Sequence, residues 1–160
     1  MKKIVGFTFL GLVIGIILGN IFTMAYYGHK IAKGMFMLQE VELIRNEDVA
    51  IQAYLNESPE IGIWALENYI DAINRFIKER EVENNKHLFL MISPKVTLKY
   101  AYVRLALLYE KIGNDLKRKE NFEKAFEYCN STNIKKELLE ERLVQVVTKL
   151  DGEFKPLDEN

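Results

Sequence analysis

The amino-terminal part of the chain is an almost unbroken apolar run from Ile4 to Ala25, in which Asn20 is the only strongly polar residue. Roughly 20 apolar helical residues cross a bilayer core about 30 Å thick, so this run is long enough to span a membrane. Tyr26 and Tyr27 follow it directly, and tyrosine is favoured at the membrane–water interface. The sequence therefore predicts a single transmembrane helix, with an amino-terminal anchor over residues 1–28.

Three glycines stand four residues apart in this run, at Gly11, Gly15 and Gly19. Positions i and i+4 share one face of a helix, and small residues at this GxxxG spacing let a second helix approach closely. We expect these glycines to form the packing face of the transmembrane helix. That face would serve either a homo-oligomer or insertion into a larger membrane complex.

The apolar run also has features of a secretory signal peptide, because Lys2 and Lys3 precede it and Ala25 offers a weak cleavage site. Signal peptides have shorter apolar regions of about 7–15 residues, so a retained signal anchor is favoured. With Lys30 and Lys33 on the far side, the positive-inside rule places the amino terminus inside. The predicted location is a single-pass protein of the bacterial inner membrane, with its carboxy-terminal domain outside the cytoplasm.

The 160-residue chain has a formal net charge of -1, and all 23 acidic residues lie beyond the apolar run. A nucleic-acid surface needs clustered Lys and Arg, whereas this remainder is mildly acidic with mixed signs, so no nucleic acid is expected as a partner. Cys129 is the only cysteine, which excludes an intramolecular disulfide and a cysteine-built zinc site. His29 and His87 have no partner at metal-ligand spacing, so no metal is expected.

Beyond the apolar run, hydrophobic residues recur with the 3.6-residue period of a helix, and no run is typical of a strand. Ser58-Pro59-Glu60 and Ser93-Pro94 are helix start signals, while Gly113 supplies a left-handed stop. The expected helices cover residues 30–55, with a break or second start at 46–48, and then 59–80, 95–112, 116–130 and 134–150.

The sequence thus predicts an all-α fold in three parts: the anchor over residues 1–28, a domain of about five helices over 29–151, and a flexible tail over 152–160. Short polar turns between the helices are typical of antiparallel neighbours. Residues 81–92 combine a polar and an apolar half, and they fit a short helix, a hairpin arm or a loop.

The segment from Lys99 to Thr132 places small, aromatic and glycine residues in a particular order. The pattern is Tyr102-x-x-Leu105-Ala106-x-x-Tyr109-Glu110-Lys111-x-Gly113, followed by Phe122-x-x-Ala125. This pattern resembles a tetratricopeptide repeat, a helix-turn-helix unit of about 34 residues. Two positions depart from the family pattern: Arg118 stands where the family has a small residue, and Asn130 replaces the closing proline. A weaker unit from about Asn46 to Glu79 carries Ala65-x-x-x-Tyr69-x-x-Ala72.

In tetratricopeptide-like domains the inner face of the first helices holds a peptide or a partner helix. The resemblance therefore implies a partner-binding groove in this chain. Its expected residues are Tyr100, Val103, Arg104, Leu107, Glu110 and Lys111, with Tyr54 and Glu47 from the preceding unit. Val103 and Leu107 fit a purely structural role in the core equally well.

No spacing of titratable residues forms a catalytic site, and the phosphate-binding and zinc-protease motifs are absent, so no enzyme activity and no cofactor are expected. The leading hypothesis is a membrane-anchored scaffold that binds a partner protein or peptide at the membrane surface. The alternative is a small membrane subunit whose glycine-faced helix drives homo-oligomerisation or insertion into a complex. A third hypothesis is an assembly factor that uses both parts.

Overall fold

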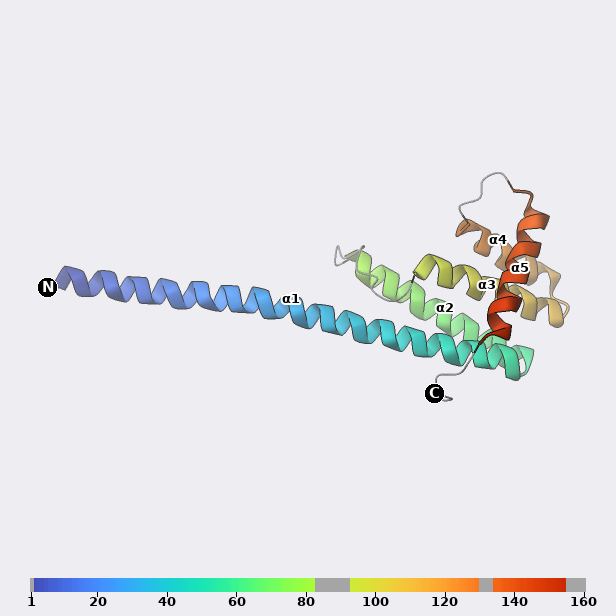
Figure 1. Ribbon diagram of the computed structural model, residues 1–160, viewed down its shortest axis with the longest axis horizontal. Helices are drawn as coiled ribbons and strands as arrows, with labels where there is room; N and C mark the ends of the chain where they lie inside the picture. The colour runs from blue at the N-terminus through green and yellow to red at the C-terminus, as the bar shows by residue number, and fades with distance from the viewer. Residues whose placement is uncertain (1, 83–92, 130–133, 155–160) are drawn as a thin grey trace. The chain divides into compact units, whose positions relative to one another are not determined.

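The computed structural model describes the backbone of residues 2–82, 93–129 and 134–154 (Figure 1). Side chains are described for residues 18–24, 26–28, 30–31, 34–80, 93–129 and 134–154. The elements are α1 (Lys2–Asn56), α2 (Pro59–Val82), α3 (Pro94–Lys111), α4 (Asp115–Glu127) and α5 (Lys136–Gly152). Every regular element in the described ranges is a helix, so the all-α prediction is confirmed for this part of the chain.

The chain divides into two compact units, Met1–Gln39 and Glu40–Asn160. The first unit is the amino-terminal part of α1, in which the Lys30 ammonium lies 4.6 Å from the centroid of the Tyr26 ring. The second unit contains the rest of α1 together with α2, α3, α4 and α5. The division predicted after residue 28 falls within the first unit.

No helix among the described residues is long and apolar enough to cross a membrane. The described side chains of the apolar run begin at Leu18, and Lys30 follows after about 12 residues, or roughly 18 Å of helix, against a bilayer core of about 30 Å. This finding corrects the predicted location as a single-pass inner-membrane protein, and with it the transmembrane helix and signal anchor. Gly11 and Gly15 lie outside the described side chains, and a Cβ added at Gly19 would meet nothing within 4 Å.

One hydrophobic cluster joins the end of α1 to α2 and to one face of α3. Its buried members are Leu43, Ala50, Ala65, Leu66, Tyr69, Ile70, Ile73, Phe76, Leu98, Ala101, Leu105 and Leu108. The α2 members recur three or four residues apart, so they form a single apolar stripe that faces α1 and α3. This stripe is why α2 folds back against α1 as the second arm of a helical hairpin.

A second cluster joins the opposite face of α3 to α4 and α5. Its buried members are Val103, Ala106, Phe122, Ala125, Leu143 and Val147. Because α3 contributes buried residues to both clusters, it is the central helix of the second unit. Ala106 and Ala125 are fully buried, and their small side chains let α3 and α4 pack closely.

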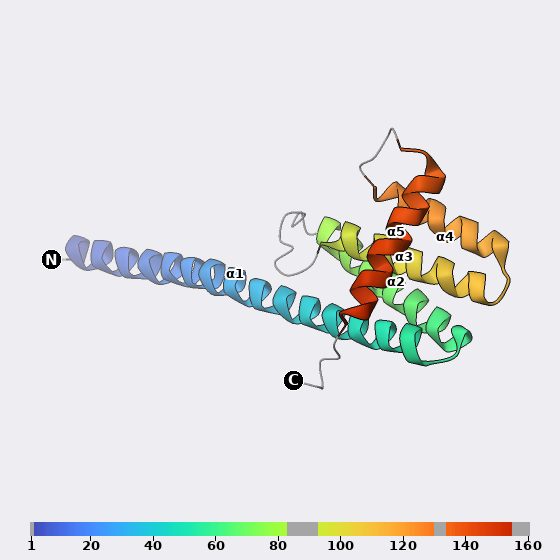
Figure 2. The same ribbon diagram turned by 45° about the vertical axis from the view of Figure 1, so that its right-hand side comes forward.

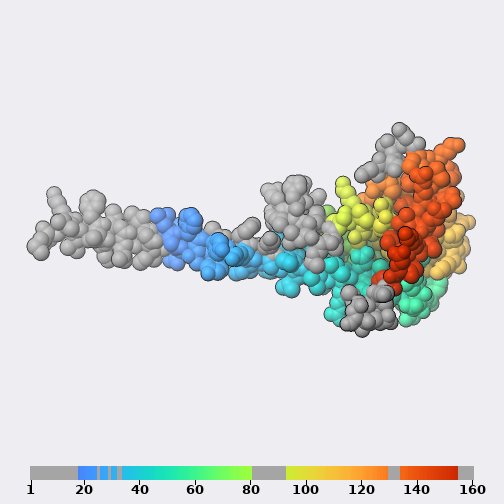
Figure 3. Space-filling model, viewed as in Figure 1, coloured from blue at the N-terminus to red at the C-terminus, as the bar shows by residue number. Residues whose placement is uncertain are grey.

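Helix α5 runs across α3 at a steep angle, as the two ribbon views agree (Figures 1 and 2). It packs on α3 through Leu143 and Val147, both of which are buried in the second cluster. In the space-filling view α5 lies on the surface of the second unit (Figure 3). One side of α3 is therefore covered by α5.

A buried ion pair between α1 and α2 lies within the second unit. Arg80 Nη2 is 3.3 Å from Glu40 Oε1, and the two side chains are 1 % and 0 % exposed. The guanidinium of Arg80 also lies over the ring of Phe76, with Cζ 4.6 Å from the ring centroid. The pair therefore ties the start of the α1 portion of this unit to the far end of α2.

The helix boundaries agree with most of the start and stop signals. Gly113 has a φ of +71°, the left-handed value that favours glycine after a helix. Asn114 then caps α4 by accepting a hydrogen bond from the Lys117 backbone N–H at 3.1 Å. Ser93 precedes Pro94 in an extended conformation but makes no side-chain cap hydrogen bond.

The break expected at residues 46–48 is absent, because α1 continues through them. Asp48 is almost buried and accepts a hydrogen bond from Gln52 Nε2, four residues on, at 3.0 Å. This contact lies along the helix and stabilises it, whereas an acidic residue in a break would face solvent. Helix α5 begins at Lys136, two residues later than expected, and the cluster at 131–133 lies outside the described residues.

Gly62 occupies the tightest crossing of the second unit. A Cβ at this position would lie 2.9 Å from Leu108 Cδ1 and 3.3 Å from the Cα of Tyr54. We expect Gly62→Val to lower the free energy of unfolding by about 1–3 kcal/mol, because α1, α2 and α3 would have to separate. Urea denaturation followed by circular dichroism measures this effect. Gly152→Val is the control, since an added Cβ there meets nothing within 4 Å, and equal losses in the two variants would contradict the close crossing.

Candidate functional site

Four predicted groove residues lie on α3, and most of them are covered. Val103 is fully buried, and Tyr100 and Leu107 are half-buried against the second cluster. Arg104 is also buried, with 5 % of its surface exposed. Because α5 packs over this side of α3, these side chains do not form an open groove in the structure.

Arg104 is held by α5 through a buried ion pair. Its Nε and Nη2 donate to Asp151 Oδ1 at 2.9 and 2.6 Å, and the two side chains are 6 % and 8 % exposed. The charges of Asp151 and Arg104 also act on Tyr54, whose pKa is raised mainly by burial and then by Asp151, with Arg104 opposing. Arg104, Asp151 and Tyr54 thus form one polar junction where α1, α3 and α5 meet.

The other predicted groove residues surround this junction with different exposure. Glu110 is exposed and pairs with Arg118 Nε at 3.5 Å, while the Lys111 ammonium lies 5.4 Å from the centroid of the Tyr54 ring. Glu47 is half-buried, and its negative charge adds to the effect of burial in raising the pKa of Tyr69. The structure therefore brings Tyr54, Arg104 and Lys111 into one region and leaves Glu110 at its solvent edge.

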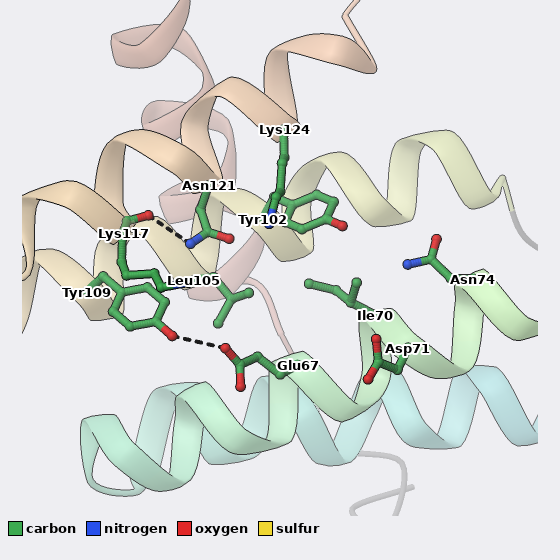
Figure 4. Close-up of a pocket in the computed structure, with 10 residues that line it drawn as sticks. All are labelled: Glu67, Ile70, Asp71, Asn74, Tyr102, Leu105, Tyr109, Lys117, Asn121 and Lys124. Atoms are coloured by element: carbon green, nitrogen blue, oxygen red, sulfur yellow. Dashed lines mark hydrogen bonds between the residues drawn. The ribbon is translucent and has the colours of Figure 1, made fainter.

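A separate cleft opens on the other side of α3, where α2, α3 and α4 meet, and we call it the α2–α4 cleft (Figure 4). It encloses about 250 Å³. Its lining residues are Glu67, Ile70, Asp71 and Asn74 from α2, Tyr102, Leu105 and Tyr109 from α3, and Lys117, Asn121 and Lys124 from α4. Carboxylates lie on the α2 wall, amines on the α4 wall, and apolar and aromatic side chains between them.

Tyr109 and Glu67 are linked across the cleft. The Tyr109 hydroxyl donates to Glu67 Oε1 at 2.9 Å, as the dashed line in Figure 4 shows. Burial and this hydrogen bond raise the pKa of Tyr109 to about 12, with smaller contributions from the charges of Glu67 and Glu120. The phenol therefore stays protonated at neutral pH and holds the Glu67 carboxylate in a fixed orientation.

Asn121 is the buried polar residue of the cleft, with only 4 % of its surface exposed. Its amide nitrogen donates to the Lys117 carbonyl oxygen at 2.8 Å. The amide oxygen accepts no hydrogen bond from any described residue, and Figure 4 shows it directed away from Lys117, toward Tyr102. A buried polar group usually finds a hydrogen-bond partner, so this oxygen is a ready acceptor for a ligand in the cleft.

The two lysines of the α4 wall share one carboxylate. The Lys117 and Lys124 ammonium groups lie 3.3 and 3.1 Å from the Glu120 carboxylate oxygens, and these hydrogen bonds lower the pKa of Glu120. The Lys124 ammonium also lies 5.6 Å from the centroid of the Tyr102 ring. The positive charge of this wall is thus already engaged by Glu120, which is not part of the cleft lining.

The α2–α4 cleft was missed in the sequence, although a signal for it exists. Glu67, Asp71 and Asn74 recur four and three residues apart, and Lys117, Asn121 and Lys124 do the same. Each set forms one polar stripe on a helix that also carries an apolar stripe. Facing stripes of opposite charge on two helices of neighbouring hairpins are what such a cleft requires.

The described residues contain no group of three His, Cys, Asp or Glu side chains that could hold a metal ion. His29 and His87 lie outside the described side chains. Cys129 is half-buried, its thiol contacts the Ala125 carbonyl oxygen at 3.6 Å, and burial raises the thiol pKa. A raised pKa lowers the thiolate fraction, which makes this cysteine a poor nucleophile at neutral pH.

With the fold and the cleft described, the chain can be set beside known proteins. No family model, curated protein or solved structure matches it. The chemistry of the α2–α4 cleft therefore has to be inferred from its own residues.

The raised pKa of Tyr109 predicts a loss of stability in alkali. The unfolded phenol titrates near pH 10, while the folded one titrates near 12, so unfolding releases a proton between these values. The free energy of unfolding should fall as pH rises from 10 to 12. Urea denaturation at pH 9 and pH 11 measures this fall, and Tyr109→Phe should make it shallower. Identical slopes in the two proteins would contradict the proposed environment of the phenol.

Proposed function

We propose that the chain is a non-catalytic, helical protein-interaction module that binds a segment of a partner protein in the α2–α4 cleft. The observation that carries this proposal is the cleft itself, an opening of about 250 Å³ among three helices that combines charges of both signs with tyrosines. Binding sites are typically concave, with an apolar and aromatic lining and a few placed polar groups. Ile70 and Leu105 supply the apolar surface, and Asn121 supplies the buried polar group.

The finer architecture that we propose is tetratricopeptide-like, with α3 and α4 as its best-formed unit. Leu105, Ala106, Phe122 and Ala125 are all buried between or beside these helices, and Gly113 ends α3 with a positive φ. These are the positions at which the repeat pattern requires filling, small and turn-forming residues. The packing therefore supports the resemblance at each position where it makes a physical demand.

The hairpin of α1 and α2 supports a second, less regular unit. Ala65 and Tyr69 are buried in the first cluster, and Ala72 is packed against it. Gly62 brings α2 close to both α1 and α3. Two such hairpins followed by α5 would form a short helical stack in which α5 is the closing helix.

Two features favour a protein segment over a small substrate. The cleft opens between helices of adjacent hairpins, so a chain can enter along it and need not be enclosed. Its lining offers hydrogen-bonding groups, charges and aromatic faces together, which is the mixture found at the edges of protein interfaces. Tyr102 and Tyr109 are of the residue type that is enriched where proteins bind one another.

Site-specific photocrosslinking in the producing cell tests this function. A photoreactive amino acid at Asn74, on the rim of the cleft, should give a discrete protein adduct, and the same amino acid at Gln145 on α5 should not. Asp71→Lys in the Asn74-labelled chain should reduce the adduct, because it reverses a charge of the lining. Equal labelling from Asn74 and Gln145, or an adduct indifferent to Asp71→Lys, would show that the cleft is not the interaction site.

A further inference from the structure

The charges and hydrogen-bonding groups of the α2–α4 cleft narrow the chemistry of the segment that it accepts. This inference rests on the proposed function and concerns one side chain of the bound segment. Among the described residues the cleft offers three acceptors with unused capacity: the Asp71 carboxylate, which makes no hydrogen bond, the amide oxygen of Asn121, and the second carboxylate oxygen of Glu67.

Donors in the cleft are largely engaged. The ammonium groups of Lys117 and Lys124 both bond to Glu120, and the Tyr109 hydroxyl donates to Glu67. The cleft therefore has more free acceptors than free donors. An incoming group with several N–H donors and a positive charge would satisfy them, whereas an anion would face Glu67 and Asp71 without a free donor.

The aromatic lining adds a second requirement, for a flat cation. The Tyr102 ring is already occupied, with Tyr128 stacked on it at a centroid distance of 6.2 Å and the Lys124 ammonium nearby. The Tyr109 ring has no such ring partner, and it lies beside Glu67 in the cleft (Figure 4). A guanidinium can stack on a phenol ring and donate in its own plane at the same time, and an ammonium cannot.

We propose that the α2–α4 cleft receives an arginine side chain from the partner segment. The guanidinium stacks on the Tyr109 ring, donates to the carboxylates of Glu67 and Asp71, and supplies the buried Asn121 oxygen with its missing donor. The aliphatic part of the arginine lies on Ile70 and Leu105. The hydrogen bond from Tyr109 fixes Glu67 in advance, so little rearrangement is needed on binding.

Fluorescence anisotropy with the full chain tests this recognition. The probe is a nine-residue peptide of glycine and alanine, labelled with fluorescein at its amino end, with arginine at its centre. Three other peptides carry lysine, citrulline or glutamate in its place. Citrulline has nearly the shape of arginine without its charge, so the arginine peptide should bind at least about tenfold more tightly, as expected for charge-assisted hydrogen bonds.

Asp71→Asn should weaken binding of the arginine peptide by about threefold to tenfold and leave the citrulline peptide almost unchanged. Glu57→Gln is the matched control: it removes the same charge from an exposed side chain outside the cleft and should have no effect. Tyr109→Phe keeps the ring and removes the bond to Glu67, so it should weaken binding less than Tyr109→Leu. Circular dichroism verifies that each variant is folded.

Three results would overturn the proposal: equal binding of all four peptides, tightest binding of the glutamate peptide, or no binding of any. The second would assign recognition to Lys117 and Lys124 instead of the carboxylates. Crosslinking at Asn74 separates these failures from failure of the proposed function. If the Asn74 adduct forms and still depends on Asp71 while arginine is not preferred, the interaction module stands and the arginine assignment is wrong.

Discussion

Arg104→Met is expected to lower the free energy of unfolding by about 3–5 kcal/mol, the cost of removing one partner of a buried ion pair. The guanidinium donates twice to Asp151, and both side chains are almost fully buried. Methionine fills a similar volume but leaves the Asp151 carboxylate desolvated without its partner. Urea denaturation of the full chain, followed by circular dichroism, measures the loss.

A double variant separates this effect from lost packing. In Arg104→Met with Asp151→Leu neither charge remains, so most of the stability should return, because replacing both members of a buried pair by apolar groups is often neutral. Hydrogen exchange adds a local measurement, since the single variant should release α5 first and its amides should lose protection before those of α3. A loss below about 1 kcal/mol in the single variant would mean that the pair is hydrated in solution.

The role of Arg104 shows where the sequence was informative and where it was not. Its helical register on α3 was predictable, and the resemblance placed it on the inner face of that helix. What occupies that face depends on α5, and nothing in the spacing of Arg104 and Asp151 indicates a pairing across 47 residues. Long-range ion pairs are set by how helices cross, and a single sequence carries no record of the crossing.

Hydrophobic periodicity predicted the core of α2 well for the opposite reason. Leu66, Tyr69, Ile70 and Ile73 were expected to be buried, and all four are. An apolar stripe on a helix has few alternatives to facing the core, so burial follows from local spacing. The same holds for Gly113, whose positive φ is a requirement of the turn itself.

Polar positions were harder to interpret. The expected break at residues 46–48 is continuous helix, because the Asp48 carboxylate bonds along the helix to Gln52. The lysines and acids of the α2–α4 cleft were read as a solvated surface, and only the packing of α3 between two hairpins brings them together. A polar residue can face solvent, a partner helix or a cleft, and its identity does not distinguish these cases.

The two sides of α3 have different capacities for binding. On one side α5 covers Val103, Arg104 and Leu107, so a partner would have to displace a helix and break a buried ion pair. On the other side the α2–α4 cleft is open, and its polar groups are arranged without a bound ligand. Binding at the open side costs less rearrangement, which is why we place the interaction there.

Phe122→Ala is expected to cost about 3–5 kcal/mol, the typical loss for removing a buried phenylalanine. Phe122 is 2 % exposed and belongs to the cluster that joins α3, α4 and α5, so its removal leaves a cavity among three helices. Phe126→Ala is the matched control, one turn further along α4, where the side chain is only half-buried and stacks on Phe122 at a centroid distance of 6.1 Å. It should cost roughly half as much, since less apolar area leaves water there on folding. Urea denaturation of both variants measures the difference, and a larger loss for Phe126→Ala would place the centre of the α3–α4 unit elsewhere and contradict the tetratricopeptide-like packing.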